Sequence, residues 1–396
     1  MRLKWRRGMR SVLVFVCIAQ GGMAEAPQQP QGLAFAVVPS LSFSSGEGWE
    51  YGGKTFFYQY GDGSSRPYRW HLLLNGARST EKKKDYYAFL DMPHLWGPGT
   101  RLSLRVEYKD FGLDEYYGLG NQPEYRRAFT DRGDPDFLSS EYYNYKHRWS
   151  AGYINAQWPI FAGRIRFLAG LAGVRTTVGT YPLPNRLAAS PRFGMAGGWT
   201  NYARLGLIRD TRDMEAAPSA GSWSDLLLEK STAVLGSDYD FARITLTDRR
   251  YFRLLPRLVF AQRLFFEHMS GHPPFYEMAV LSGSWQRFEG LGSNQSMRGV
   301  PRLLFAGPTK LLGNFELRCR LFDRRILRQD LTFYGHLFLD GGKVWLKRDP
   351  ATLDHLHFSQ GAGLHVQWKT DLIGALDIGR SPYKDLAIYL TFGNLF

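Results

Sequence analysis

Cysteine is scarce in this chain of 396 residues, which has Cys17 and Cys319 alone. Because Cys17 lies in an N-terminal segment that we expect to be removed, the mature chain would have one thiol and no internal disulfide. Long hydrophobic runs are missing as well, since no stretch of about 18 consecutive apolar residues occurs, and this argues against a helical membrane protein. The sequence also lacks an obvious linker, low-complexity tract or repeat, so we expect residues 27–396 to form one domain.

Residues 1–26 have the pattern of a secretory signal peptide. Five basic residues precede an apolar run over 12–19, and Ala24-Glu25-Ala26 offers a cleavage site of the A-x-A type. A transmembrane anchor would need an apolar run about twice as long. The sequence therefore predicts an exported protein.

The charge balance is basic, with 50 Lys and Arg against 36 Asp and Glu and a net charge of +14. Removal of residues 1–26, which carry five basic residues and one acid, leaves +10. An exported chain rarely meets nucleic acid, so we expect outer-membrane lipid and lipopolysaccharide as the anionic partners and no nucleic acid. Arg78 and the basic run 82–84 fit this loosely, but a solvated turn is the better explanation of them.

Short alternating segments, 43 glycines and an aromatic content of 15% favour β structure. Segment 101–110 is the clearest, because Leu102, Leu104 and Val106 alternate with polar residues, as expected for a strand between lipid and a polar lumen. The expected strands are 33–43, 50–60, 68–78, 85–92, 101–110, 142–158, 164–177, 202–210, 223–235, 239–252, 258–268, 314–322, 331–344, 357–368, 372–378 and 385–396. We therefore predict an all-β protein, a 16-stranded antiparallel transmembrane β-barrel with a long inward-folded loop.

The lengths of the connections support this topology. The long connections 111–141, 178–201 and 269–313 follow odd-numbered strands, whereas 159–163 and 253–257, which follow even-numbered strands, are short. Long external loops and short periplasmic turns are typical of outer-membrane barrels. The sequence predicts a location in the bacterial outer membrane, with the long loops outside the cell.

The candidate site lies between residues 290 and 345. Glu316 and Asp340 fall on the polar faces of two alternating segments, in which Phe338 is the one exception to the pattern. Arg298 lies upstream in a loop rich in Gly and Ser. Because a guanidinium has a fork of donors, Arg298 could fold back and be shared by the two shielded carboxylates.

Three short motifs in this region carry a family resemblance. MRGV (297–300), NFELR (314–318) and FLDGG (338–342) resemble motifs of the bacterial surface antigen superfamily, the BamA/TamA-like barrels of the outer membrane. LGLIRDTRDMEAAPSAG (205–221) and the closing GNLF (393–396) are similar to further family sequences. The resemblance implies assembly or translocation of protein or lipid at the outer membrane.

The resemblance also implies a latch that pins the long loop inside the barrel. Its expected members are Arg298, Gly299, Glu316, Phe338, Asp340 and Gly342. Glycines at these positions would permit close backbone approach. The alternative is that Arg298 is exposed and that the acids pair with the neighbouring Arg318 or Arg320.

The closing segment is expected to be a lipid-facing strand. Phe396, Leu390, Ile388 and Leu386 share one face, which should meet lipid with the terminal aromatic at the interface. In outer-membrane barrels such an end, here Gly393 to Phe396, resembles the signal that the assembly machinery reads.

The sequence gives little support for an enzymatic function. His336 and Asp340 are four residues apart, about 13 Å along a strand, and cannot form a dyad. A metal-ligand spacing is also missing among His268, His272, His355 and His357. We therefore expect no catalytic residue, metal or cofactor. A passive, anion-preferring channel is the alternative function. The segment before the first strand is too short for a POTRA domain, so we expect separate periplasmic partner proteins.

Overall fold

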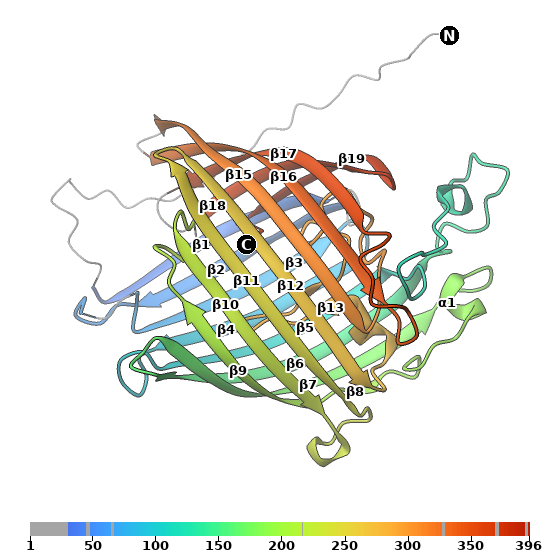
Figure 1. Cartoon of the computed structure of the whole chain (residues 1–396), viewed down its shortest axis with the longest axis horizontal. Coiled ribbons are helices and arrows are strands. Elements are labelled where there is room, and N and C mark those ends of the chain that lie inside the picture. Colours follow the sequence, from blue (N-terminus) through green and yellow to red (C-terminus); the bar gives the residue numbers. More distant parts are fainter. Residues whose placement is uncertain are drawn as a thin grey trace, which may run out of the picture.

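The computed structural model describes residues 31–44, 48–64, 67–215, 217–326, 329–368, 372–392 and 395–396. The predicted signal peptide and Gly393 lie outside the described residues. Within the described part, sixteen strands close into one antiparallel barrel (Figure 1). They are β1 (Leu33–Ser44), β2 (Gly48–Gln59), β3 (Trp70–Ser79), β4 (Lys83–Pro93), β5 (Arg101–Glu115), β6 (Asn144–Ile160), β7 (Ile165–Thr180), β9 (Tyr202–Asp210), β10 (Gly221–Ser231), β11 (Phe241–Leu255), β12 (Leu258–Gly271), β15 (Thr309–Ile326), β16 (Gln329–Trp345), β17 (His357–Trp368), β18 (Leu372–Ser381) and β19 (Lys384–Phe392).

Smaller elements lie in the connections. The two-residue strand β8 (Gly198–Trp199) adds to the end of β7, and β13 (Val280–Leu281) pairs with β14 (Phe288–Glu289). The short helices are η1 (Arg127–Thr130), α1 (Arg186–Ala189), η2 (Ala233–Leu235) and η3 (Phe275–Ala279). None of the helices in the described ranges has the length and apolar character to cross a membrane.

Side-chain alternation explains why these segments form a barrel wall. On β5, Val106 is 66% exposed on the outer face, whereas Ser103 and Glu107 are buried on the lumen side. Leucines on other strands, such as Leu171, Leu205 and Leu337, are also exposed, which gives the barrel an apolar exterior around a polar lumen. The predicted fold class is confirmed, including the number of barrel strands.

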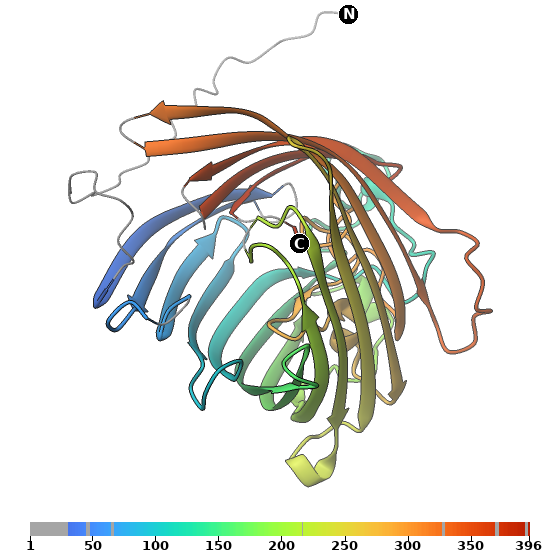
Figure 2. The same ribbon diagram turned by 60° about the vertical axis from the view of Figure 1, so that its left-hand side comes forward.

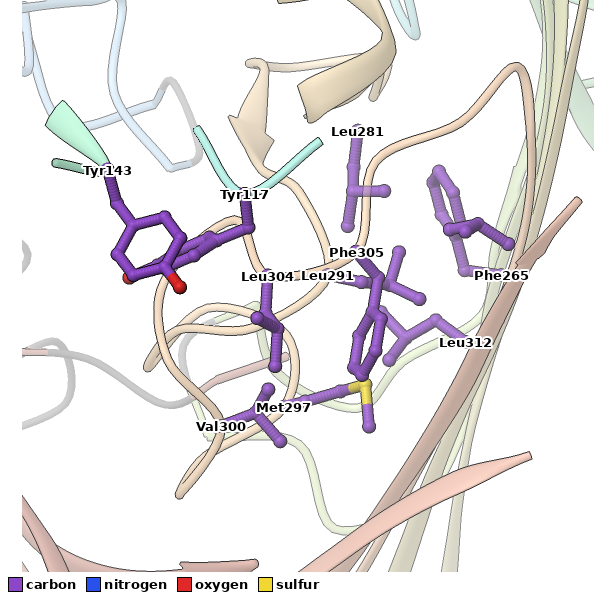
Figure 3. Close-up of a cluster of buried hydrophobic side chains, with 11 residues drawn as sticks. Tyr117, Tyr143, Phe265, Leu281, Leu291, Met297, Val300, Leu304, Phe305 and Leu312 are labelled. Carbon is purple, nitrogen blue, oxygen red and sulfur yellow. The ribbon is translucent and has the colours of Figure 1, made fainter. Parts of the chain in front are cut away.

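The long connection between β12 and β15 folds into the barrel, where Figure 2 shows it as gold to orange segments surrounded by strands. Its apolar side chains pack with residues of the wall and of the β5–β6 connection (Figure 3). The buried cluster comprises Tyr117, Tyr143, Phe265, Leu281, Leu291, Met297, Val300, Leu304, Phe305, Leu312 and Val344. A small hydrophobic core therefore forms inside the barrel around the inward-folded loop.

The seam between the first and last strands has a short ladder. β1 pairs with β2 along its whole length. Among the described residues, it pairs with β19 at two positions, Phe43 with Leu390 and Ser44 with Tyr389. Near the start of β1, Phe35 and Val37 are 72% and 63% exposed. Within the described ranges, the part of β1 before Phe43 has no partner strand on this side, so its backbone groups form an edge.

Candidate functional site

Arg298 lies at the tip of the inward loop and binds three carboxylates. Its Nε and Nη2 donate hydrogen bonds to Oδ2 and Oδ1 of Asp340, each at 3.0 Å. Its Nη1 lies 2.7 Å from Oε1 of Glu316 and 3.4 Å from Oδ2 of Asp377. Arg298, Glu316 and Asp340 are at most 1% exposed. The structure thus brings together the three residues that the sequence had suggested, and adds Asp377 from β18.

The contact of Phe338 with Arg298 explains why this apolar residue lies on the polar face of its strand. It is on the lumen face of β16, two residues before Asp340 and on the same side, so its ring lies beneath the guanidinium. The Cζ atom of Arg298 is 3.6 Å from the ring centroid. A cation over an aromatic face is stabilised by the ring quadrupole.

Electrostatics keep Arg298 charged. Burial alone would lower the pKa of the guanidinium, but Asp340 and Glu316 outweigh it and raise the pKa above its ordinary value.

The backbone beside Arg298 is held against the last two strands. Gly299 has a φ of +93°, and a Cβ there would lie 2.7 Å from the backbone nitrogen of Arg380. Its N–H donates to Oη of Tyr389 at 3.0 Å, and Oγ of Ser381 donates to its carbonyl at 2.6 Å. Glycine is needed here both for its conformation and for its close approach to β18.

Gly342 has a comparable role on β16. A Cβ at this position would lie 2.7 Å from Cδ2 of Leu291 and 2.8 Å from Sδ of Met297. The missing side chain lets the apolar part of the loop rest on the wall. Each residue predicted for the latch therefore belongs to the loop tip or contacts it, and Glu316 and Asp340 are its charged partners.

The alternative pairing expected from the sequence is present in part. Arg318 also binds Glu316, with its Nη2 at 2.7 Å from Oε2. Glu316 is therefore shared by Arg298 and Arg318. Arg320, in contrast, pairs with Asp323 where both side chains are about half exposed.

Further anchors of the loop were not anticipated from the sequence. Arg302 forms an ion pair with Asp114 at the end of β5. Arg243 on the wall binds Glu277 of the loop at 2.7 Å, and Nη2 of Arg204 donates to the carbonyl of Gly283 at 2.6 Å. These pairs join residues more than 30 positions apart in the sequence, so no local motif indicates them.

The C-terminal residue lies elsewhere than expected. Phe396 is 7% exposed and packs with Tyr251 and Ala261, while its carbonyl oxygen accepts a hydrogen bond from Nη2 of Arg318 at 3.1 Å. The expectation that Phe396 sits at the lipid interface was wrong, because the end of the chain turns to the buried side of the wall. Leu386 of β19 is 57% exposed on the outer face, as expected.

A polar cavity of about 340 Å³ remains beside the loop. Its charged lining comprises Lys54, Lys83, Asp85, Arg105, Glu107, Lys109, Asp114, Arg204, Glu277, Arg287, Glu289 and Arg302. Basic residues outnumber acidic ones along this lining. The cavity is therefore suited to anions more than to cations.

An antiparallel barrel with an apolar exterior, a polar lumen and a loop pinned inside it has the architecture of outer-membrane β-barrels. The model of the Omp85 superfamily domain matches residues 71–378, and the chain belongs to this superfamily. The relationship predicted from the sequence motifs is confirmed.

Two solved structures extend the comparison of folds. BamA from Haemophilus ducreyi lacking POTRA domains 1-3 is 13% identical with a TM-score of 0.57, and the alignment covers 92% of this chain and 70% of that one. CdiB from Escherichia coli is 13% identical with a TM-score of 0.59, over 94% of this chain and 63% of CdiB. At such identities the likeness concerns the fold. No curated protein matches the sequence significantly.

Proposed function

We propose that this protein inserts or translocates protein or lipid at the bacterial outer membrane, and that it does so through the seam between β1 and β19. The observation that carries the proposal is the link between loop and seam. Tyr389, which faces Ser44 across the seam, also accepts the hydrogen bond of Gly299 at the loop tip. The same residue therefore contacts both parts that would have to move.

Opening the seam should require little free energy. In the described residues its ladder comprises two residue pairs, which in an antiparallel sheet amount to about two hydrogen bonds. At about 1 kcal/mol net for each bond, opening costs about 2 kcal/mol before any compensation. The edge of β1 before Phe43, which has no partner on this side among the described residues, would then pair with an incoming strand, because main-chain hydrogen bonds accept many sequences.

The loop sets when the lumen is accessible. Arg298 pins the tip, and Arg302 and Arg243 hold the rest. Release of the tip would remove the contacts of Gly299 to Ser381 and Tyr389 together, so that β18 and β19 would be freed on their lumen side. We propose separate periplasmic proteins as the source of the client, and outer-membrane lipid and lipopolysaccharide as the surroundings of the barrel. No enzymatic step is part of this proposal.

A passive channel with a preference for anions is the second candidate, and the basic lining of the cavity favours it. The two functions differ in what the edge of β1 touches. A photo-reactive amino acid at Phe35 should cross-link newly made outer-membrane polypeptides or lipopolysaccharide in cells. Phe57, its register partner on β2, is the matched control and should capture less. Equal or absent cross-linking at both positions would contradict the seam proposal and leave the channel.

A further inference from the structure

Three side chains on neighbouring strands converge on one point of the lumen wall. They are His336 on β16, His365 on β17 and Asp377 on β18. Oδ1 of Asp377 lies 3.2 Å from Nε2 of His365 and 3.4 Å from Nε2 of His336. The potential ligand atoms all lie within 4.8 Å of one another, and the side chains are 1%, 6% and 10% exposed in the order His336, His365, Asp377.

A glycine makes this convergence possible. Gly363 of β17 is the register partner of His336 on one side and of Asp377 on the other. A Cβ at Gly363 would lie 2.2 Å from Oδ1 of Asp377 and 2.4 Å from Cε1 of His336. Any larger residue would therefore fill the space in which the two side chains meet. His365 is two residues further along β17 and thus points to the same face.

The contact of His365 with Asp377 is within hydrogen-bond distance, and both separations also fit a tetrahedral metal ion. Zinc binds imidazole nitrogen and carboxylate oxygen at about 2.0–2.2 Å in tetrahedral geometry, so neighbouring ligand atoms lie about 3.3 Å apart. The two separations of 3.2 and 3.4 Å match that edge. An N–H···O hydrogen bond is usually 2.7–3.2 Å long, and the contact of His336 exceeds this range.

We propose that His336, His365 and Asp377 form a binding site for a borderline divalent transition metal, with zinc as the best match. Two imidazoles and one carboxylate are a ligand set that zinc takes with its fourth position open to water or another ligand. This departs from the expectation of no metal drawn from the sequence. The site does not depend on the proposed transport role.

A metal ion bound at this site would affect Arg298, which lies beside it. Nη1 of Arg298 lies 3.4 Å from Oδ2 of Asp377 and 3.5 Å from Nε2 of His336. A dication at the site would compete with the guanidinium for both groups and repel it. Arg298 would keep Asp340, which accepts from its Nε and Nη2, and also Glu316, which shares Nη1 with Asp377. Metal binding should therefore weaken one of the three carboxylate contacts that hold the loop tip.

Repulsion between the metal ion and Arg298 should also lower the affinity of the site for the metal. In direct ion pairs, the carboxylates of Glu316, Asp340 and Asp377 face the guanidinium groups of Arg298 and Arg318. One negative charge is left over in this set, but the buried guanidinium of Arg263 also interacts with Asp340 and Glu316 and offsets it. Binding is expected to be weaker than in a site without a neighbouring arginine.

The test is a titration of the full-length barrel, purified in detergent without a histidine tag and stripped with a chelator. Added Co²⁺ should give the visible absorption of a tetrahedral site at one ion per chain, and Zn²⁺ should displace it. Absence of a saturable tetrahedral signal in the wild-type barrel would overturn the proposal, with no variant needed.

Variants assign the ligands. His336→Ala, His365→Ala and Asp377→Asn should each lower the affinity by more than about 100-fold, since loss of an outer-sphere partner alone costs 10–100-fold. His71→Ala removes another buried lumen histidine, on β3, and should leave binding unchanged. Gly363→Val should abolish binding while keeping all three ligands. Undiminished Co²⁺ absorption in a folded His336→Ala, His365→Ala double variant would show that the ion binds elsewhere and refute the assignment.

Discussion

Replacement of Arg298 by alanine should loosen the tip of the inward loop without unfolding the barrel. Removal of one partner of a buried ion pair costs about 3–5 kcal/mol, and Arg298 is 1% exposed. We expect the lower end, about 3 kcal/mol, because Glu316 keeps Arg318 and Asp340 keeps Asn314. At 1.4 kcal/mol for each factor of ten, the open population of the loop tip should rise about 100-fold.

The assay is cysteine labelling at a buried position of the loop. Ser296 is 0% exposed, so Ser296→Cys in a Cys319→Ser background should react with a maleimide only when the tip opens. Arg298→Ala should accelerate labelling by up to about 100-fold, and Glu316→Gln with Asp340→Asn should do the same. Arg320→Ala removes a half-exposed arginine from the same strand as Glu316 and is the matched control. Equal labelling rates in Arg298→Ala and wild type would refute the latch.

Further outcomes follow from the same contacts. Arg298→Lys should rescue the loop in part, because an ammonium lacks the fork that reaches both carboxylates; labelling at residue 296 measures this. Gly299→Ala should destabilise the tip by at least about 1–2 kcal/mol, the cost of a left-handed conformation, as seen in protease sensitivity of the loop. Deletion of Phe396 should lower the folded fraction on heat-modifiable gel migration, because its packing with Tyr251 is lost. Although Glu277 is buried, Arg287 and Arg243 lower its pKa to about 2. Its stabilisation is present above the ordinary carboxyl pKa and lost as the pH falls towards 2, so Trp fluorescence of the loop should change only in that acid range.

The strands, and the pairing of Arg298 with Glu316 and Asp340, could be predicted from the sequence. Alternation in 101–110 follows from a wall with one apolar and one polar face, and it placed Val106 outside and Glu107 inside. Glu316 and Asp340 could be paired with Arg298 because shielded acids require a cation and a motif indicated which one. Even the irregularity at Phe338 was visible, although its contact with the guanidinium was not.

The missed features depend on the register between strands. His336 meets Asp377 because Gly363 lies between them on β17, and alternation within one strand says nothing about that alignment. The contact of Gly299 with Tyr389 joins residues 90 positions apart. The position of Phe396 was mispredicted because alternation was continued past Phe392, where β19 ends.

The most direct test of opening between β1 and β19 is a disulfide that locks these two strands together. Phe43 and Leu390 are paired across it, and such neighbours are close enough for a disulfide. Phe43→Cys with Leu390→Cys, in a Cys319→Ser background and as the sole copy in the host, should stop delivery of newly made protein or lipopolysaccharide to the cell surface. Reductant should restore it, and the control pair Phe35→Cys with Phe57→Cys, which locks β1 to β2, should have no effect. Normal surface delivery by the fully oxidised seam lock would contradict opening between β1 and β19.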